Sequence, residues 1–473
     1  MISRIIWRVF SLLYGTLVLA LFTAFAVLDG SIFRRPTEKE KKELAIAQQK
    51  FWDLSQSPLG LKHKFFSLED GRKLHYVEKL GTNSSKNLTV FIHGFPDSWI
   101  LWQGLLTSSR LSQNSVLVAV DLPGYGGSDG LPNYGANAVL ETMTAFILGM
   151  REEYIASQVE EAGKVFVVSH DWGSIIGYRL ASEAPQLADR FIISCAVYPQ
   201  QTYATIKAHF ASSSKMLHTW TQRPFSVRLL KSALKNITPV LKQASKSGYV
   251  FAFNLPSPLS NFCGAMGNMW LLRIMHRVAT GNAEPSGKPL LLGPTEAAEA
   301  MTASIGPGPA QFGASDTKED YPESVKRRAP TGGWPEKIRI YREGLLLGQW
   351  EKSLETIVRL SELDRGSPRS RRSSSGAGLF EDGPPGALKA RATVVYGKKD
   401  PAFEPKLTLE DISDYLTKGS QVVVLGEAGH WLPIEKDSAE VLEEVVGWAL
   451  EGEEAPLKAR LEGFGTVKVT IDK

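Results

Sequence analysis

The chain has 473 residues, of which 43% are hydrophobic and 22% are charged, and its formal net charge is +4. This length exceeds one ordinary domain, the apolar fraction can bury a large core, and so small a net charge does not favour a nucleic-acid partner. The two cysteines, Cys195 and Cys263, indicate no disulfide framework, and the eight histidines show no metal-ligand spacing. We therefore expect a globular protein without a bound cofactor or metal.

An uncharged apolar stretch near the amino terminus runs from Val9 to Leu28. Its twenty residues would measure about 30 Å as a helix, which is enough to span a bilayer. We therefore predict that residues 1–30 form an uncleaved membrane anchor. A cleaved signal peptide, which would give a secreted protein, is the alternative, because Ala24-Phe25-Ala26 resembles a cleavage site.

The charges that flank this stretch predict its orientation. More Lys and Arg residues follow it than precede it, so the positive-inside rule places the rest of the chain on the cytosolic side, in a single-pass protein that we expect in the endoplasmic reticulum. Glycosylation sequons at Asn83, Asn87 and Asn236 would instead suit a lumenal domain. Residues 31–60 are expected to form a charged stalk, helical over 37–54.

Alternating strand and helix patterns follow the stalk, and they predict an α/β fold with a mostly parallel central sheet. Residues 61–200 form the first part of this core, and residues 389–455 form the second part. The expected strands are the short apolar runs 64–67, 73–78, 88–92, 116–120, 165–168, 191–195, 394–396 and 422–425, and the last helix covers 438–450.

The residues between the two parts of the core, 201–388, carry few strand signals and are expected to form a largely helical lid domain. Two stretches within them, 281–335 and 364–386, are rich in small and turn-forming residues and are expected to be loop insertions. The tail, residues 456–473, alternates like a strand near its end, and its pattern indicates no role.

The sharpest local signal is Ser169-His170-Asp171-Trp172-Gly173-Ser174, directly after the strand over 165–168. Small residues around Asp171 allow a buried strand to turn sharply into a helix, which is the setting of a nucleophile elbow. A carboxylate in that position is a good nucleophile toward a saturated, electrophilic carbon, and its attack gives an alkyl ester. The simpler alternative, an Asp that caps the next helix, explains neither the small residues nor the partners downstream.

Two further polar residues, Asp400 and His430, each leave a later strand, so nucleophile, acid and histidine occur in an order typical of hydrolytic triads. We expect His430 to activate water, and Asp400 to orient and stabilise the imidazole. The loop after the strand over 88–92 and the residue after Asp171 predict an oxyanion hole made of the backbone N–H groups of Phe95 and Trp172.

These motifs resemble those of the epoxide hydrolases of the α/β-hydrolase superfamily. The chain carries His-Gly-Phe-Pro-x-Ser-Trp at 93–99, Asp-x-Pro-Gly-Tyr-Gly-x-Ser at 121–128, an Asp followed by Trp-Gly, and a closing Gly-His-Trp. The resemblance implies an α/β-hydrolase fold with a helical lid, and an activity that opens epoxides to vicinal diols.

The resemblance also implies two lid tyrosines that hydrogen-bond the epoxide oxygen. Tyr249 begins a matching segment, 249–256, in which Asn replaces the usual Gln, and Tyr341 begins a Tyr-Arg pair that precedes Trp350 by two residues more than the family pattern. A phenol aimed at the developing alkoxide would stabilise it. The residues expected to contact the substrate are Trp99, Phe253 and Trp431.

Two other functions stay open. A haloalkane or haloacid dehalogenase shares the Asp, His and acid set and uses the Trp after the nucleophile to hold halide, although a leaving halide needs N–H donors and no proton. A non-catalytic protein of this fold would bind a lipid or a partner, but the intact Asp171, Asp400 and His430 argue against it. Aromatic lid residues and the anchor favour a small lipophilic epoxide as substrate, in detoxification or lipid metabolism.

Overall fold

The computed structural model describes residues 2–81, 87–155, 163–279, 292–313, 319–366 and 383–473. Within these residues one nine-stranded sheet has the order β1-β2-β4-β3-β5-β6-β7-β8-β9. The strands are β1 (Lys62–Ser67), β2 (Lys73–Lys79), β3 (Asn87–Ile92), β4 (Ser115–Val120), β5 (Val165–His170), β6 (Arg190–Ser194), β7 (Ala392–Gly397), β8 (Gln421–Leu425) and β9 (Val467–Asp472). Strands β3 to β8 are parallel, whereas β1, β2 and β9 pair antiparallel. The predicted α/β fold is confirmed.

The parallel strands are rich in Val, Ile and Leu because both faces of the sheet are covered. In the register of β3, Val90 lies opposite Val118 of β4 and Val167 of β5, and these three side chains belong to one buried apolar cluster. The neighbouring Phe91 and Val168 belong to a second cluster. Since successive side chains of a strand point to opposite faces, the two clusters lie on the two faces of the sheet.

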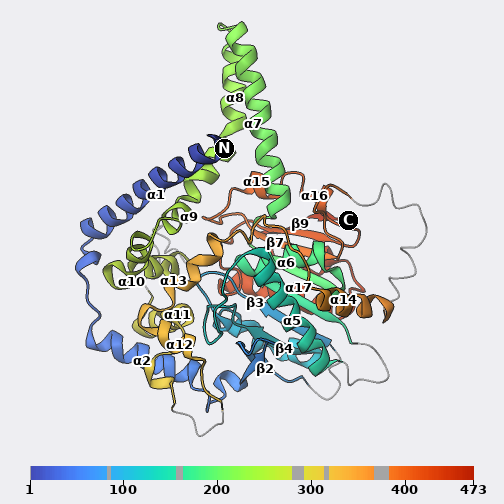
Figure 1. Cartoon of the computed structure of the whole chain (residues 1–473). Helices are drawn as coiled ribbons and strands as arrows, with labels where there is room; N and C mark the ends of the chain where they lie inside the picture. The colour runs from blue at the N-terminus through green and yellow to red at the C-terminus, as the bar shows by residue number, and fades with distance from the viewer. Residues whose placement is uncertain (1, 82–86, 156–162, 280–291, 314–318, 367–382) are drawn as a thin grey trace.

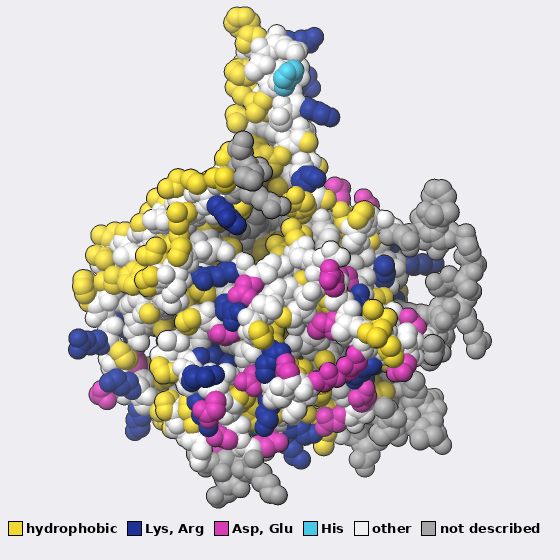
Figure 2. Space-filling view, in the orientation of Figure 1, with side chains coloured by type: hydrophobic (Ala, Val, Ile, Leu, Met, Phe, Trp, Pro, Cys, Tyr) yellow, Lys and Arg dark blue, Asp and Glu magenta, His cyan; other side chains and the backbone are white. Residues whose placement is uncertain are grey.

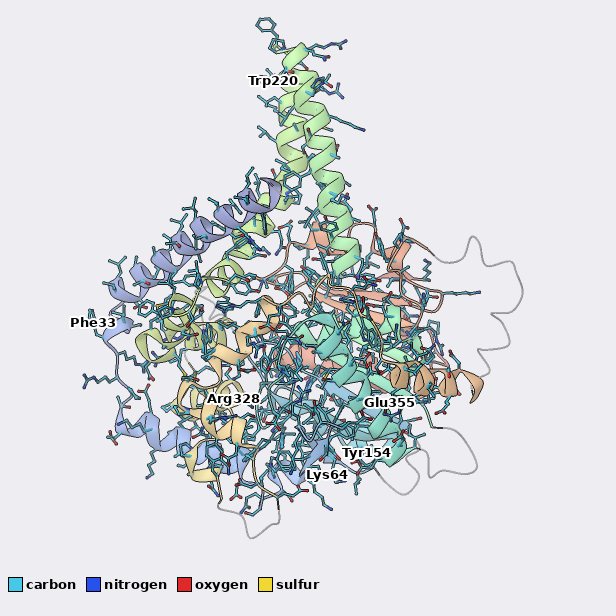
Figure 3. The ribbon with its side chains drawn as sticks, viewed as in Figure 1. Phe33, Lys64, Tyr154, Trp220, Arg328 and Glu355 are labelled. Atoms are coloured by element: carbon cyan, nitrogen blue, oxygen red, sulfur yellow. The ribbon has the colours of Figure 1, made fainter. Side chains whose placement is uncertain are left out.

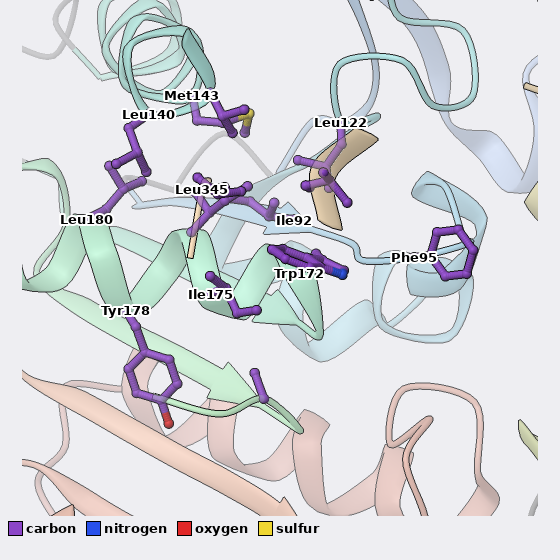
Figure 4. Close-up of a cluster of buried hydrophobic side chains, with 14 of the residues drawn as sticks. Ile92, Phe95, Leu122, Leu140, Met143, Trp172, Ile175, Tyr178, Leu180 and Leu345 are labelled. Carbon is purple, nitrogen blue, oxygen red and sulfur yellow. The ribbon is translucent and has the colours of Figure 1, made fainter. Parts of the chain in front are cut away.

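Helices cover both faces of the sheet (Figure 1). The helices α5 (Ala136–Tyr154) and α6 (Trp172–Glu183) contribute to the first cluster, and Figure 4 shows Leu140 of α5 beside Leu180 of α6 in this cluster. The helix α17 (Lys436–Leu450) contributes to the second cluster. Shorter helices complete the core: α3 (Gln103–Leu106), α4 (Ser109–Asn114), α15 (Pro405–Leu409), α16 (Ile412–Tyr415) and α18 (Leu457–Arg460).

The described residues between β6 and β7 form helices and no strand, and we call them the helical segment. Its helices are α7 (Pro199–Gln222), α8 (Val227–Lys246), α9 (Gly248–Phe253), α10 (Leu259–Ala279), α11 (Pro294–Ile305), α12 (Glu323–Arg328), α13 (Trp334–Lys337) and α14 (Leu354–Gly366). The guanidinium of Arg179, on α6, ties this segment to the core by donating to the carbonyl oxygens of Leu345 at 2.7 Å and Gly348 at 2.9 Å.

The stretch 281–335 differs from the loop expected there, because its described part contains α11, α12 and α13. Pro and Gly residues stand at the ends of these helices rather than within them: Gly293 and Pro294 begin α11, and Gly306 ends it. The many Pro and Gly residues of this stretch therefore correspond to the beginnings and ends of short helices rather than to a loop. Most of the other expected insertion, 364–386, lies outside the described residues.

Two helices precede the core. The helix α2 (Glu38–Trp52) begins at Thr37, whose side chain accepts from the backbone N–H of Glu40 in a capping box. Its last residues, Phe51 and Trp52, are fully buried, and the indole of Trp52 donates to the carbonyl oxygen of Thr302 at 3.2 Å. The expected helix over 37–54 is therefore present, and its C-terminal end packs against the body.

The helix α1 (Ile2–Leu28) contains Ile5–Leu28, a stretch long and apolar enough to cross a membrane by length and composition. One face of this helix is buried against the helical segment, since a Cβ on Gly15 would lie 2.4 Å from the carbonyl oxygen of Phe251. Figure 1 shows α1 running along the outside of the molecule beside α9 and α10.

Candidate active site

The turn between β5 and α6 holds Asp171 in a strained conformation. Its φ of 50° and ψ of −120° lie where a residue with a side chain is rarely found, and such strain is typical of functional sites. The first turn of α6 requires glycine at position 173, because a Cβ there would lie 2.3 Å from the carbonyl oxygen of Ile92. The hydroxyl of Ser174 fixes the turn to β6 by donating to the carbonyl oxygen of Ser194 at 2.9 Å.

The carboxylate of Asp171 is buried, and its two oxygens have different partners. The backbone N–H of Phe95 donates to Oδ2 at 2.9 Å, and the N–H of Trp172 also hydrogen-bonds the carboxylate. Close approach of the loop requires Gly94, since a Cβ there would lie 2.5 Å from Oδ2. Burial raises the pKa of Asp171, whereas His430 and the two N–H groups lower it and leave a net rise.

The imidazole of His430 lies between two carboxylates. Its Nδ1 is 2.7 Å from Oδ2 of Asp400, and its Nε2 is 3.7 Å from Oδ1 of Asp171, the oxygen that Phe95 does not contact. The backbone N–H of Ala402 donates to the other oxygen of Asp400 at 2.6 Å and holds that carboxylate in place. Burial alone would lower the pKa of His430, but the nearby carboxylates, led by Asp400, raise it to about 9.

The structure brings Tyr249 and Tyr341 to the same site from different elements. Tyr249 lies on α9, and Tyr341 ends a short 3-10 helix, Ile338–Tyr341. The centroids of the two rings are 6.0 Å apart, and the ring of Tyr341 is 4.7 Å from that of Trp172. Burial, together with the charge of Asp171, raises the pKa of both phenols, so they stay protonated donors.

Aromatic side chains surround these hydroxyl groups. The ring of Phe253 is 5.4 Å from Phe95 and 5.3 Å from Tyr341, so the expected contact residue Phe253 lies in the site. Figure 4 shows Trp172 near Ile92 and Phe95 farther out in the loop that follows this strand. Trp431 is also close, with its ring 4.8 Å from that of His430.

The structure does not bring the side chain of Trp99 to this group. Its ring lies 6.0 Å from Phe51 and 6.1 Å from Trp52, in the second apolar cluster, where α2 packs on the core. Its backbone N–H donates to Asp121 at 2.8 Å, and this bond directs the indole away from Asp171. Trp99 therefore packs on α2, whereas a substrate-contact residue was expected.

Asp97 is a buried carboxyl beside the site that was not among the expected site residues. The indole N–H of Trp431 donates to Asp97 Oδ2 at 3.1 Å. Burial, followed by the charge of Asp171, raises the pKa of Asp97 to about 7. Its position inside the segment 93–99 is the signal that could have pointed to it.

One group of possible metal ligands occurs among the described residues: Cys195, Asp400 and His430, whose ligand atoms lie within 4.8 Å of one another. Two of these three side chains are already hydrogen-bonded to each other. Burial raises the pKa of the Cys195 thiol, so this side chain stays a neutral thiol and a poor ligand. The group is suited to proton transfer rather than to metal binding.

Parts of the chain are similar to known hydrolases. Residues 89–266 match the alpha/beta hydrolase family. Over 161 residues the chain is 27% identical to Epoxide hydrolase 2 of Caenorhabditis elegans. This alignment covers 33% of the chain and only 40% of the length of the relative. Over 289 residues it is 26% identical to Epoxide hydrolase 4 of Mus musculus, in an alignment that covers 57% of the chain and 77% of the relative.

A solved structure gives a similar alignment. The crystal structure of an epoxide hydrolase of Bacillus megaterium, in complex with an inhibitor, is 18% identical and aligns over 82% of this chain and 99% of that chain, with a TM-score of 0.44. Residues 89–266 of the chain are thus similar to the alpha/beta hydrolase family, and its sequence resembles that of epoxide hydrolases.

Proposed function

We propose that the protein hydrolyses epoxides to vicinal diols through a covalent ester on Asp171. The observation that carries this proposal is the division of labour between the two oxygens of that carboxylate. Oδ2 accepts a hydrogen bond from Phe95, while Oδ1 faces His430 and is free to attack a carbon. A serine hydrolase has no counterpart to this arrangement, because its oxyanion hole holds an oxygen of the substrate.

In the first half-reaction, Oδ1 of Asp171 attacks one carbon of the epoxide, and the bond between that carbon and the ring oxygen breaks. The electron pair of that bond goes to the ring oxygen. Tyr249 and Tyr341 donate hydrogen bonds to this oxygen, and one of the two phenols transfers its proton to it, so that the oxygen becomes a hydroxyl. Solvent then returns a proton to that phenol. The product is a hydroxyalkyl ester of Asp171.

In the second half-reaction, His430 Nε2 takes a proton from water, and the resulting hydroxide attacks the carbonyl carbon of the ester. Negative charge develops on Oδ2, to which the N–H of Phe95 already donates, and the N–H of Trp172 also hydrogen-bonds this carboxyl group. Asp400 stabilises the imidazolium through the 2.7 Å contact. Collapse of this intermediate breaks the bond between the carboxyl carbon and Oδ1, and the imidazolium of His430 gives its proton to the departing oxygen, which leaves in the diol. The new carboxyl group, with one oxygen from water, loses its proton to solvent and becomes the carboxylate again.

The two half-reactions should depend on pH in different ways. In the free protein, the charge of Asp171 contributes to the raised pKa of His430, about 9. Ester formation removes that charge, so the pKa of His430 falls and the imidazole becomes a base at lower pH. Alkylation needs ionised Asp171, and it should slow as the pH falls through the pKa of Asp171, which burial raises.

Single-turnover kinetics over about pH 4 to 10 would measure both limbs. We expect the rate of ester hydrolysis to rise with pH and to reach half its maximum below the pKa of His430 in the free protein, measured by NMR titration. A midpoint at or above that value would contradict the proposed loss of charge. An alkylation rate that is independent of pH would contradict the role of Asp171.

The two tyrosines test the choice between epoxide and halide chemistry. Tyr249→Phe and Tyr341→Phe should each slow alkylation about 10- to 100-fold, because one phenol remains, and the double variant should lose on the order of 10⁴-fold. Rapid-quench measurement of the ester gives these rates. Tyr203→Phe, which removes an exposed hydroxyl on α7, is the matched control and should leave the rate unchanged.

Under dehalogenase chemistry both changes would be close to neutral, because a leaving halide needs no proton. An unimpaired double variant would therefore remove the epoxide assignment while leaving Asp171 and His430 in their roles.

The helical segment acts as a lid over this site, and its lining favours a small lipophilic substrate. Tyr249 and Phe253 belong to α9, and Tyr341 lies between α13 and α14, so all three come from this segment. The surrounding rings of Phe95, Trp172 and Phe253 offer apolar contact, and the polar groups converge at Asp171. This pattern suits a compact apolar ligand with one reactive oxygen.

The body of the protein lies on the cytosolic side of a membrane. Two of the three sequons are engaged inside the structure, which argues against glycosylation. The amide of Asn236 donates to the carbonyl oxygen of His209 at 3.0 Å and to the hydroxyl of Ser213 at 3.1 Å. The amide of Asn87 donates to the carbonyl oxygen of Asn114 at 3.1 Å. The third sequon, Asn83, lies outside the described residues.

The direct test of the function is turnover of a panel of aliphatic and aromatic epoxides beside a haloalkane. We expect diol from at least one epoxide and no halide from the haloalkane. Halide release without diol would support a dehalogenase, and the absence of both products, with the fold intact, would support a binding protein.

A further inference from the structure

The helices α7 and α8 pair as an antiparallel hairpin that extends well beyond the rest of the molecule (Figure 1). We call residues 199–246 the hairpin. The interior of this pair is small and polar. Ser213 and Ala233 are buried between the helices, and the hydroxyl of Ser213 donates to the carbonyl oxygen of Ala233 at 3.2 Å. Asn236 joins the same network through His209.

Many of the large apolar side chains of the hairpin are exposed instead. Phe225, at the turn between the helices, is 97% exposed, and Leu241 is 60% exposed. The other exposed apolar side chains are Tyr203, Phe210, Leu217, Val227 and Leu234. The residues of each helix are seven apart, 203, 210 and 217 on α7 and 227, 234 and 241 on α8, which places those of each helix on one stripe. An exposed apolar stripe over a polar interior is the reverse of what water favours, and it marks an interaction surface.

The charge of the hairpin is as one-sided as its apolar surface. It contains eight Lys and Arg residues and no Asp or Glu, which leaves 46 basic and 50 acidic residues for the rest of the chain, a net charge of −4. Seven of the eight are exposed: Lys207, Lys215, Arg223, Arg228, Lys231, Lys235 and Lys242. Figure 2 shows apolar side chains along one edge of the hairpin and basic side chains along the other.

The outer face of α1 continues the apolar edge of the hairpin. Its exposed side chains include Leu13 and Phe25, and Figure 2 shows this apolar surface running from the hairpin along α1. In Figure 3, Trp220 near the tip of the hairpin and Phe33 just after α1 mark the two ends of this surface. Between α1 and α10 the surface is hollowed into an apolar groove, lined by Ala20, Thr23, Leu259 and Phe262 among others.

The helix α1 is fastened to the body along its length. Near its start the ring of Trp7 lies 6.0 Å from Phe251, and in its middle the hydroxyl of Tyr14 donates to the carbonyl oxygen of Ala244, on α8, at 3.1 Å. Beyond its end, the indole of Trp270 donates to Asp29 at 3.2 Å. Since α1 packs on α9, the helix that carries Tyr249, the position of α1 is coupled to that of the site.

We infer that the outer face of α1 and the apolar edge of the hairpin form one docking surface for a bilayer that contains anionic phospholipids. The helix α1 lies in the interfacial plane, and the aromatic tip of the hairpin enters the headgroup region. The seven exposed Lys and Arg side chains of the hairpin bind the anionic headgroups. An amphipathic helix with an apolar face and a Lys- and Arg-rich polar face binds membranes in this manner.

Vesicle flotation tests the charge requirement. The full-length protein is mixed with vesicles of phosphatidylcholine alone, or of phosphatidylcholine with phosphatidylserine. A variant with Arg228→Gln, Lys231→Gln, Lys235→Gln and Lys242→Gln should bind the anionic vesicles on the order of 100-fold more weakly than wild type. A control with Lys62→Gln, Lys418→Gln, Lys458→Gln and Lys468→Gln has the same net charge and should bind like wild type. Thermal unfolding followed by circular dichroism checks that both variants fold.

Lipid contact is tested by fluorescence quenching. A fluorophore on Phe225→Cys should be quenched by nitroxide-labelled lipid, whereas the same fluorophore on Leu354→Cys, an exposed site on α14, should not. Equal loss of flotation in both charge variants would overturn the inference, as would binding that needs no basic hairpin residue. A vesicle-bound protein whose label at position 225 is unquenched would show that α1 alone holds the membrane, and this result would also overturn it.

Discussion

Asp171→Ala is expected to abolish turnover of epoxides, with a loss of about 10⁴-fold or more, while the protein stays folded. The reason is that no other carboxylate is held by the N–H of Phe95 opposite the imidazole of His430. Removal of a buried carboxylate whose pKa is raised by burial relieves a desolvation cost, so folding should not suffer. Initial rates with a fluorogenic epoxide, beside thermal unfolding curves, measure both effects.

Asp171→Asn is the matched control, because it keeps the shape of the side chain. It should be equally inactive when fresh, and it should slowly regain activity if the amide hydrolyses to a carboxylate. Full activity of freshly prepared Asp171→Ala would remove the covalent mechanism. If Asp171→Ala loses its unfolding transition as well as its activity, Asp171→Asn takes its place in the comparison, because this variant keeps the shape of the side chain.

His430→Gln should separate the two half-reactions. Alkylation by Asp171 needs no proton from the histidine, whereas hydrolysis of the ester needs the imidazole as base. After mixing with an epoxide, we expect the ester to accumulate to about one equivalent per protein and then to persist, since its hydrolysis slows by about 10³-fold or more. Mass spectrometry of a proteolytic digest should find the adduct on the peptide that contains Asp171.

Asp400→Asn provides the graded comparison for this experiment. It should slow ester hydrolysis less than His430→Gln, because Asp400 orients and stabilises the imidazole but exchanges no atom with the substrate. An adduct on another peptide, or none in His430→Gln, would show that the roles of Asp171 and His430 are assigned wrongly.

The sequence predicted the sheet well because buried parallel strands are short apolar runs with clear ends. Each expected strand lies within two residues of an observed one, and the alternating tail is the strand β9. The convergence of Asp171, Asp400 and His430 was also predictable, because β5, β7 and β8 are parallel and their carboxyl ends meet at one edge of the sheet. Chain order and strand direction together predicted that they would meet.

Features that depend on packing were not predictable from a local pattern. The direction of the Trp99 side chain is set by the bond from its N–H to Asp121 and by the contact with α2, residues far away in the sequence. The helix α11 is stabilised by packing on α2, a contact that no local sequence pattern reveals. Its Pro- and Gly-rich flanks alone therefore suggested a loop. The burial of Asp97 likewise depends on Trp431.

One measurement tests the central claim, the covalent ester on Asp171, most directly: a single turnover of an epoxide in water labelled with oxygen-18, with protein in excess. The mechanism transfers an oxygen of Asp171 to the diol and an oxygen of water to Asp171. We therefore expect the diol of the first turnover to contain no heavy oxygen and the Asp171 peptide to gain one. Heavy oxygen in the first diol, with an unlabelled Asp171 peptide, would mean that water attacks the epoxide directly, and it would contradict the account.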